Sequence, residues 1–296
     1  MSAGVPAVSV IVPFLDARPY LARSVDSLLD QSLPRNAYEL LFVDNGSTDG
    51  GEALVAARPG VRLLREEKRG AYAARNRGVA EASGEILAFT DPDCEAEREW
   101  LERIAAAIGE PGVGIVIGHR LAAAEDGLLD LVMAYESQKA AYVIRRGDDE
   151  VLFGHTNNMA VRRGVMEAVG PFLEIDRGGD TVLVHRAVAT YGRGILRYHP
   201  EIRVRHLEMT GLARYYGKSG TYGRSNERLR ELVPFRPLTT RERWGVFRST
   251  LRERGWSPLR GATLLAVLAV GMLGYEGSRL LARIRGWTGG RRIVRG

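Results

Sequence analysis

Cysteine is nearly absent from this chain. Its length of 296 residues suits one large domain or two modest ones. The single cysteine, Cys94, excludes an internal disulfide and a zinc cluster built on thiolates. The 35 glycines follow no three-residue period, which excludes a collagen-like fibre, and 45% apolar residues exclude intrinsic disorder as the main state. The first residues lack the basic start and the long apolar stretch of a signal peptide, so nothing argues for secretion.

Positive charge is concentrated at the C-terminal end of the chain. Residues 227–296 hold 15 arginines, five glutamates and no lysine or aspartate, a net charge of +10, whereas residues 1–226 carry −4. A basic segment on a slightly acidic body suggests contact with a polyanion, either a membrane surface or nucleic acid. A general preference for arginine explains why lysine is rare, but it does not explain the segregation of charge.

The first 120 residues alternate between short apolar runs and amphipathic segments. This alternation predicts an α/β fold with a mostly parallel sheet flanked by helices. The expected strands cover residues 8–15, 39–43, 61–65, 85–90 and 113–118, and the expected helices cover 19–29, 52–58, 71–82 and 100–108.

The pattern is less regular after residue 120. We expect helices over 127–144 and 180–191, a short strand over 158–162, and one helix or a pair of helices over 210–232. The segment 197–206 has strand character but is expected to be broken by Pro200.

Polar clusters follow three of the expected strands, at residues 44–49, 65–70 and 91–93. Parallel α/β sheets bind ligands at the carboxyl ends of their strands, but every strand end is polar because loops are polar. Both interpretations stay open at this point.

The sequence Asp91-Pro92-Asp93 places two carboxylates in a turn after a buried strand. Hard oxygen ligands of this kind suit Mg²⁺ or Mn²⁺, which keep positions open for phosphate oxygens. Pro92 fixes its own φ angle and so stiffens the turn. The pattern is short, and its position after a strand is what favours a metal site.

Two other strand ends carry candidate contacts to a nucleotide. Asp44 can accept hydrogen bonds from a base or a ribose, or it can simply build the turn and cap the next helix. Gly70 opens the helix at 71–82, and Arg69 and Arg75 are placed to meet a diphosphate near that helix N-terminus. A solvent-facing arginine is the alternative for both.

With these residues the chain resembles the inverting glycosyltransferases of family 2, which have the GT-A fold. The resemblance covers roughly residues 7–210, and the motifs follow the order and spacing of that family. They are Val8-Ser-Val-Ile-Val-Pro13, Val43-Asp-Asn-Gly-Ser-Thr-Asp49, Ala74-Arg-Asn76, Gly84-Glu85, Asp91-Pro-Asp93, Asn158-Met-Ala-Val-Arg-Arg163, Val169-Gly-Pro-Phe172, Gly178-Gly-Asp180 and Val204-Arg-His206.

The resemblance implies a Rossmann-like domain that binds a nucleotide-diphosphate sugar, UDP- or GDP-linked, together with Mn²⁺ or Mg²⁺. It implies that the donor is held by Pro13, Asp44, Gly70, Arg75 and Asp91.

The metal is implied to lie at Asp93 and Asp91, with Asp93 the more direct ligand. His206 completes this set or contacts the phosphate, and a structural histidine near a strand end is an equal alternative.

Asp180 is implied to be the catalytic base, which takes the proton of the acceptor hydroxyl. Many relatives have Glu before this aspartate, and here Gly179 takes that position, while nearby Asp176 competes for the role. Many relatives also have a second aspartate after Asp44, where this chain has Asn45.

Processive members of the family carry Gln-x-x-Arg-Trp, and here Thr240 stands in the glutamine position before Arg243 and Trp244. We therefore expect one sugar to be added per acceptor.

The C-terminal segment is expected to associate with a membrane. Residues 262–275 are 14 uncharged residues, about 21 Å of helix, which is short of the roughly 30 Å hydrocarbon core. A helix in the plane of an anionic membrane fits best, with a true span and a helix packed on the body as alternatives. The apolar run favours lipid over nucleic acid, so no nucleic-acid partner is expected.

These observations divide the chain into a GT-A domain over 1–226 and a basic, helical, membrane-associating region over 227–296. Within the GT-A domain, 1–120 is the nucleotide-sugar half and 121–226 the acceptor half. The predicted enzyme works at the cytoplasmic face of the membrane on a lipid-linked or cell-envelope glycan. Two alternatives are a polyprenyl-phosphate sugar transferase and a nucleotide-sugar-binding protein without catalysis.

Overall fold

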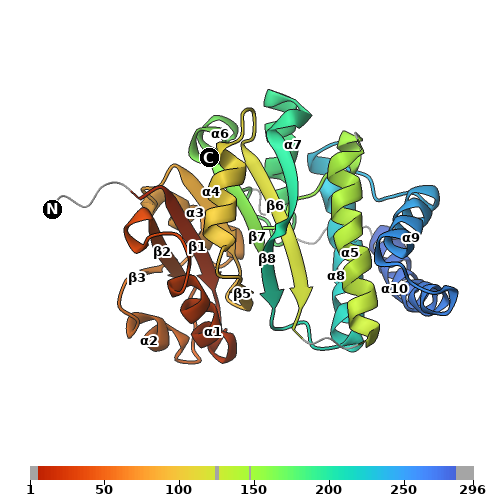
Figure 1. Cartoon of the computed structure of the whole chain (residues 1–296), viewed down its shortest axis with the longest axis horizontal. Coiled ribbons are helices and arrows are strands. Elements are labelled where there is room, and N and C mark those ends of the chain that lie inside the picture. Colours follow the sequence, from red (N-terminus) through yellow and green to blue (C-terminus); the bar gives the residue numbers. More distant parts are fainter. Residues whose placement is uncertain (1–5, 124–126, 147, 285–296) are drawn as a thin grey trace.

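A computed structural model of the chain describes residues 6–123, 127–146 and 148–284. Within these residues an eight-stranded mixed sheet has the order β3-β2-β1-β4-β7-β6-β8-β5 (Figure 1). The strands are β1 (Val8–Phe14), β2 (Tyr38–Asp44), β3 (Val61–Arg65), β4 (Ile86–Thr90), β5 (Cys94–Ala96), β6 (Ile115–Ala122), β7 (Asn158–Arg162) and β8 (Leu196–His206). The α-helices are α1 (Arg18–Leu29), α2 (Gly51–Ala56), α3 (Ala71–Glu81), α4 (Trp100–Gly109), α5 (Gly127–Arg145), α6 (Arg163–Val169), α7 (Gly179–Tyr191), α8 (Leu212–Leu232), α9 (Thr240–Arg254) and α10 (Pro258–Ile284).

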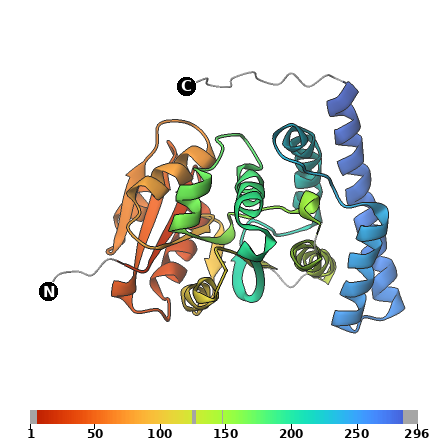
Figure 2. The same ribbon diagram turned by 90° about the horizontal axis from the view of Figure 1, so that it is seen from above.

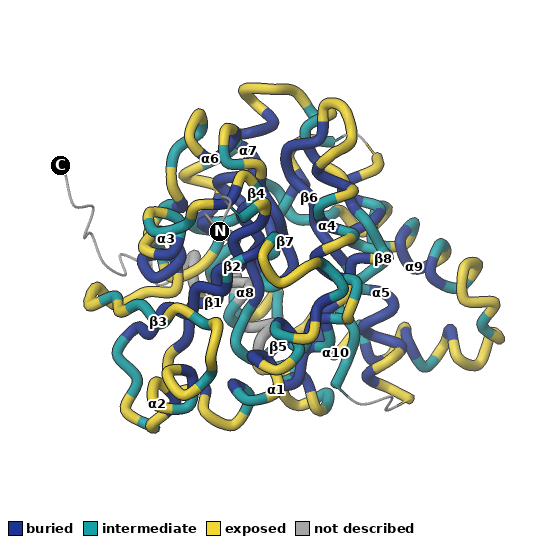
Figure 3. The backbone as a smooth tube through the Cα atoms, turned by 60° about the vertical axis from the view of Figure 1, so that its left-hand side comes forward, coloured by how far each residue is buried: buried dark blue, intermediate teal, exposed yellow. Residues whose placement is uncertain are grey.

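Helices cover both faces of the sheet, because side chains alternate between its two sides. On β1, Val10 and Val12 pack with α1 and α4, whereas Ile11 packs with α3, α5 and α7. All seven residues of β1 are buried, and burying each Val or Ile side chain is worth about 1.5–3 kcal/mol. The centre of the sheet is therefore a core on both sides, and the exposed positions lie on the loops and on the outer sides of the helices (Figure 3).

The sheet is parallel over β3-β2-β1-β4 and mixed beyond it. Strand β7 runs antiparallel to β4 and β6, and β5 runs antiparallel to β8. The expected α/β class is confirmed. The three-residue strand β5 was not predicted, because Cys94–Ala96 is too short to show a hydrophobic period.

The expected break at Pro200 is wrong, since β8 continues through it. Its pairing with β6 skips residues 200–202, so the proline sits in a bulge where no ladder hydrogen bond is needed. The Asn158 amide closes the gap by donating to the carbonyl oxygens of His119 (2.8 Å) and Ile202 (2.9 Å). Because Pro200 sits in a bulge and does not end the strand, β8 continues to His206, the site residue at its end.

Three helices follow the sheet and stand at the edge opposite the N-terminal strands (Figure 2). The segment expected to hold one helix or two over 210–232 contains the single helix α8, which packs against α10. Helix α5 packs against α9 and α10. Helix α8 continues across residue 226, and the division of the chain at that position stays a prediction.

Helix α10 is longer than the uncharged run alone, because it continues through Glu276 for 27 residues, about 40 Å. Leu264 and Val267 on one side are buried against the other helices, whereas Leu259 and Leu273 on the opposite side are 78% and 77% exposed. Pro258–Ser278 is the one described helix whose length and composition would allow it to cross a membrane, and 22% of its most apolar window is buried.

Candidate active site

A cavity of about 1070 Å³ lies where β4 and β8 end, and α8, α9 and α10 form its far wall. Five of the residues singled out in the sequence line it: Arg75, Asp91, Asp93, Asp180 and His206. They come from α3, the turn after β4, the first turn of α7 and the end of β8. The fold thus brings together residues that are up to 131 positions apart in the sequence.

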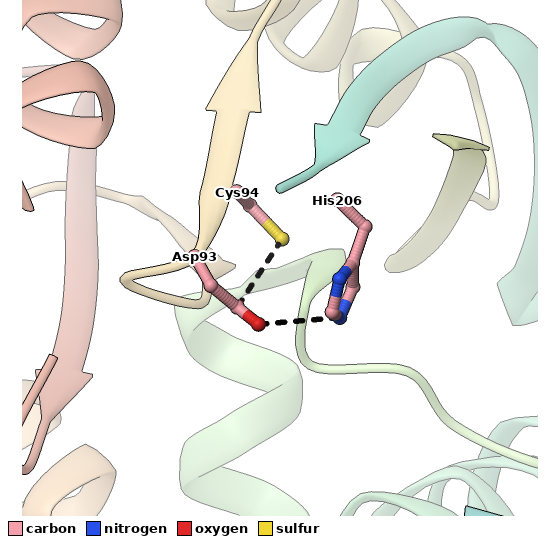
Figure 4. Close-up of side chains that lie close together, drawn as sticks. All are labelled: Asp93, Cys94 and His206. Atoms are coloured by element: carbon pink, nitrogen blue, oxygen red, sulfur yellow. Dashed lines mark hydrogen bonds and ion pairs between the residues drawn. The ribbon is translucent and has the colours of Figure 1, made fainter. Parts of the chain in front are cut away.

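Asp93 and His206 meet because β5 pairs with the last residues of β8 (Figure 4). An Asp93 Oδ2 to His206 Nε2 distance of 3.5 Å joins the two side chains, which are 15% and 8% exposed. The Cys94 sulfur completes a group whose candidate ligand atoms all lie within 4.8 Å of one another. Burial raises the pKa of the Cys94 thiol well above its usual value, which disfavours its thiolate form. A carboxylate oxygen and an imidazole nitrogen are left as ligands, which suits Mn²⁺ better than Mg²⁺.

Asp91 is not part of this group, because its carboxylate is engaged by Arg75. The Arg75 guanidinium donates to Asp91 Oδ1 at 2.5 Å, and its side chain is 5% exposed. It also lies over the ring of Tyr72, 5.4 Å from the ring centroid. Its Nε has no hydrogen-bond partner among the described residues, which leaves one buried donor of this cation for a ligand.

Asp180 lies in the first turn of α7, where three donors converge on its carboxylate. Oδ1 accepts from the Tyr72 hydroxyl (2.8 Å) and the Thr181 backbone N–H (2.9 Å), and Oδ2 accepts from the Thr156 backbone N–H (3.3 Å). Burial nevertheless raises the pKa of Asp180 above its ordinary value, although these donors and Arg75 act in the opposite direction. A carboxyl with a raised pKa is a stronger base once it is ionised.

The surroundings of Gly179 explain why glycine, and not glutamate, precedes Asp180. A Cβ at Gly179 would lie 2.5 Å from the Leu173 carbonyl oxygen and 3.0 Å from the ring of Tyr72. The place that a glutamate side chain would need is therefore taken by the tyrosine that binds Asp180.

We expect Tyr72→Phe to shift the acidic limb of the pH–activity profile to higher pH. The Tyr72 hydroxyl donates to the ionised form of Asp180, so its loss raises the pKa of this carboxyl further. The base must be ionised to accept a proton, so activity would then be lost at a higher pH as the pH falls. Initial rates across pH for this variant, compared with Tyr191→Phe at an exposed position, test the assignment. An unchanged acidic limb would disconnect Asp180 from the rate.

Pro13, Asp44 and Gly70 are not among the described residues that line the cavity. Pro13 and Asp44 lie at the carboxyl ends of adjacent strands β1 and β2, and Asp44 Oδ1 accepts from the Ser47 backbone N–H at 2.9 Å. This bond is the turn-building role that the sequence left open.

Asn45 explains why the second aspartate is missing. Its amide nitrogen donates to the carbonyl oxygens of Glu66 (2.9 Å) and Lys68 (2.8 Å), and its oxygen accepts from the Gly70 N–H (2.8 Å). An aspartate has no hydrogen to donate to two carbonyls. Asn45 therefore fixes the loop before α3, where Gly70 has a φ of 137° that favours glycine.

Two further features that the sequence singled out also line the cavity: the alternative base Asp176, and the Arg243-Trp244 pair of the processivity motif. Asp176 is exposed in the loop before α7, in contrast to the enclosed Asp180. Arg243 and Trp244 lie on α9, and the Arg243 guanidinium sits over the ring of Tyr275, 5.6 Å from its centroid.

Sequence reasoning gave no role to several side chains that line the cavity. Tyr72 lies inside the helix expected over 71–82, but its bond to Asp180 spans 108 residues and has no local signal. Arg120, Lys139 and His155 also line the cavity, from a strand, a helix and a loop.

Comparisons with known proteins identify the family of this chain. The family described as "Glycosyl transferase family 2" matches residues 9–170. Glycosyltransferase AglE of Haloferax volcanii is 32% identical over 213 residues, which is 68% of this chain and 69% of AglE. The chain belongs to glycosyltransferase family 2.

Solved structures of similar fold include one in complex with a nucleotide sugar and one in complex with a nucleotide. The mannosyltransferase PcManGT from Pyrobaculum calidifontis, in complex with GDP-Man and Mn²⁺, gives a TM-score of 0.62 at 20% identity over 95% of this chain and 84% of that one. TarS of S. aureus, in complex with UDP, gives a TM-score of 0.56 at 16% identity over 94% of this chain and 91% of that one. At these identities the likeness confirms the GT-A fold of this family 2 glycosyltransferase.

Proposed function

We propose that this family 2 glycosyltransferase is an inverting, metal-dependent enzyme. It moves one sugar from a nucleotide-diphosphate sugar to an acceptor hydroxyl on a lipid-linked or cell-envelope glycan. The observation that carries the proposal is one cavity with two separate carboxylate centres: the Asp93–His206 pair and the enclosed Asp180. One centre suits a metal and its diphosphate, and the other suits a proton transfer.

Asp93 and His206 would hold the ion, with Asp91 as a proposed further ligand whose other oxygen is fixed by Arg75. When bound, Mn²⁺ or Mg²⁺ offsets the negative charge that develops on the leaving diphosphate. Arg75 lies at the same place with a fixed positive charge, and we assign it to the diphosphate. Asp44 is assigned to the base or ribose, beside Pro13 and Gly70 at the same sheet edge.

Asp180 acts as the base in this proposal. It accepts the proton of the acceptor hydroxyl while the hydroxyl oxygen forms a bond to the anomeric carbon of the sugar. The bond from that carbon to the donor's phosphate oxygen breaks, and its electron pair leaves with the nucleoside diphosphate. Attack from the side opposite the leaving group inverts the configuration of the sugar.

The first test is a donor-hydrolysis screen. The full chain is incubated with UDP-, GDP- and dTDP-sugars in the presence of Mn²⁺ or Mg²⁺, and release of the nucleoside diphosphate is followed. The proposal requires release from at least one donor, and the release must stop when a chelator is added.

We further propose that α10 attaches the enzyme to the cytoplasmic face of an anionic membrane. Its exposed side is apolar, and exposed arginines lie nearby: Arg248, Arg252, Arg254 and Arg260. Apolar contact with the lipid and attraction to anionic headgroups act together in such helices. The opposite side of α10 packs on α8 and α5, so the packed and the membrane-facing alternatives apply to different sides of one helix.

Binding to anionic vesicles should therefore fall as salt is raised, because screening weakens the arginine attraction. Replacing Leu259 and Leu273 together by Gln should reduce binding at all salt concentrations, and both side chains are exposed enough to change without harm to the core. Leu15→Gln, at an exposed position far along the sheet, is the matched control. Flotation of all three proteins with vesicles is the measurement, and equal flotation of the double variant and the control would reject attachment through α10.

A further inference from the structure

The cavity extends well beyond the catalytic groups, to a second cluster of charged side chains. Arg120 on β6, Lys139 on α5 and His155 in the loop before β7 all line it. Arg120 and Lys139 both act electrostatically on His155, so the three side chains are near one another.

The positive charge of this cluster is only partly balanced. Lys139 forms an ion pair with Glu136, which also accepts a hydrogen bond from the Tyr215 hydroxyl at 3.3 Å. The Arg120 guanidinium forms no ion pair or hydrogen bond with another residue in the described ranges. Arg120 also acts electrostatically on Glu136, so two cations share one carboxylate and the cluster keeps an excess of positive charge.

His155 gives a second, independent sign of a missing ligand. Its Nε2 is shielded from solvent and has no hydrogen-bond partner among the residues that the structure describes. The His155 ring packs on the ring of Phe153, with 4.6 Å between ring centroids. Burial and the two cations hold the pKa of His155 well below its usual range, so the imidazole is neutral. Enclosed polar atoms of this kind normally have a partner.

Part of the cavity wall is apolar. Leu265, Leu268 and Met272 on α10 and Phe247 on α9 line the same cavity. The same cavity is therefore lined by the Asp180 and Asp93 centres, by a cationic cluster, and by apolar side chains of α9 and α10.

We propose that Arg120, Lys139 and His155 bind the phosphate or diphosphate of a lipid-linked acceptor, whose hydrocarbon chain lies along α10 and α9. This inference rests on the proposed transferase function and names its acceptor class. The acceptor hydroxyl then reaches Asp180 from the side of the membrane, and the donor diphosphate stays at Asp93, His206 and Arg75. The negative charge of the acceptor phosphate complements the positive charge of Arg120, and the hydrocarbon chain of the acceptor packs on the apolar wall.

The test uses farnesyl diphosphate as a water-soluble probe, with inorganic diphosphate and farnesol as the two halves of its chemistry. Calorimetry on the full chain should show tighter binding of farnesyl diphosphate than of either half. Arg120→Gln should weaken this binding by about 10- to 100-fold, the worth of hydrogen bonds to a charged group. Arg98→Gln, at a side chain that is 66% exposed elsewhere on the surface, is the matched control and should bind as the wild type does.

A separate variant tests the part of the proposed site that binds the hydrocarbon chain of the lipid. Ala269 is exposed and lines the cavity, whereas Ala262 is exposed on the same helix and does not line it. Ala269→Trp should weaken farnesyl diphosphate but not inorganic diphosphate, and Ala262→Trp should change neither.

Equal affinity of farnesyl diphosphate for the wild type and Arg120→Gln would overturn the proposed site. Affinities for farnesyl and inorganic diphosphate that do not differ would overturn the lipid part. Donor hydrolysis by the wild type, measured alongside, separates these failures from a failure of the transferase proposal itself.

Discussion

Asp180→Asn should lower turnover by about 10²–10⁴-fold while donor affinity is retained, because a positioned general base contributes this much to a rate. The loss corresponds to about 3–5 kcal/mol of transition-state stabilisation. Asparagine keeps the size of the side chain and can still accept from Tyr72 and Thr181, so the turn that holds it should persist. Steady-state rates and donor titrations on the same preparation separate the two effects.

Asp176→Asn is the matched control, because Asp176 faces the same cavity from an exposed loop. A large loss in this variant, with none in Asp180→Asn, would move the base to Asp176. Full turnover in both variants would instead favour transfer to a phosphate acceptor, as in a polyprenyl-phosphate sugar transferase, since a phosphate needs no base to attack.

Asp93→Ala should weaken metal-dependent donor binding by at least the 10- to 100-fold that is typical for loss of an outer-shell partner of a metal. The variant removes the carboxylate that meets His206 at the end of β8, which is the more direct of the two proposed carboxylate ligands. Calorimetry with the donor from the screen, with Mn²⁺ and with chelator, measures the change. The chelator should weaken binding to the wild type and have little further effect on the variant.

The control is Asp30→Ala, which removes a carboxylate that is 79% exposed at the end of α1. It should bind the donor as the wild type does. Donor binding that is equally strong in Asp93→Ala, with and without chelator, would show that the diphosphate is held without an ion.

The N-terminal half of the fold could be predicted from sequence because its strands are buried on both faces. The run over β1 and the run over β2 are almost continuously apolar, and their polar ends mark the sheet edge. The segments β5 and the bulge in β8 could not be predicted, because each is defined by pairing with a strand that is distant in the sequence. The bulge also depends on Asn158, whose amide has no local signal of that role.

The candidate site shows the same division. Asp91, Asp93 and Asp180 stand in short motifs at element ends, so sequence could single them out, and their roles stay predictions. The contacts that tune them come from distant segments: Tyr72 to Asp180, and Arg75 to Asp91. In the sequence, Asn45 and Gly179 departed from the aspartate and the glutamate that many relatives have at these positions. In three dimensions each accommodates a specific neighbour, the Gly70 loop and the Tyr72 ring.

The central claim is a single displacement at the anomeric carbon by a hydroxyl that Asp180 deprotonates. Its most direct measurement uses methanol as a small acceptor with the α-linked donor found in the screen, because a methyl glycoside keeps its anomeric configuration once it is formed. NMR of that product should show the β-glycoside, made by the wild type and nearly absent with Asp180→Asn. A methyl α-glycoside, formed with retention of the donor's configuration, would contradict the account.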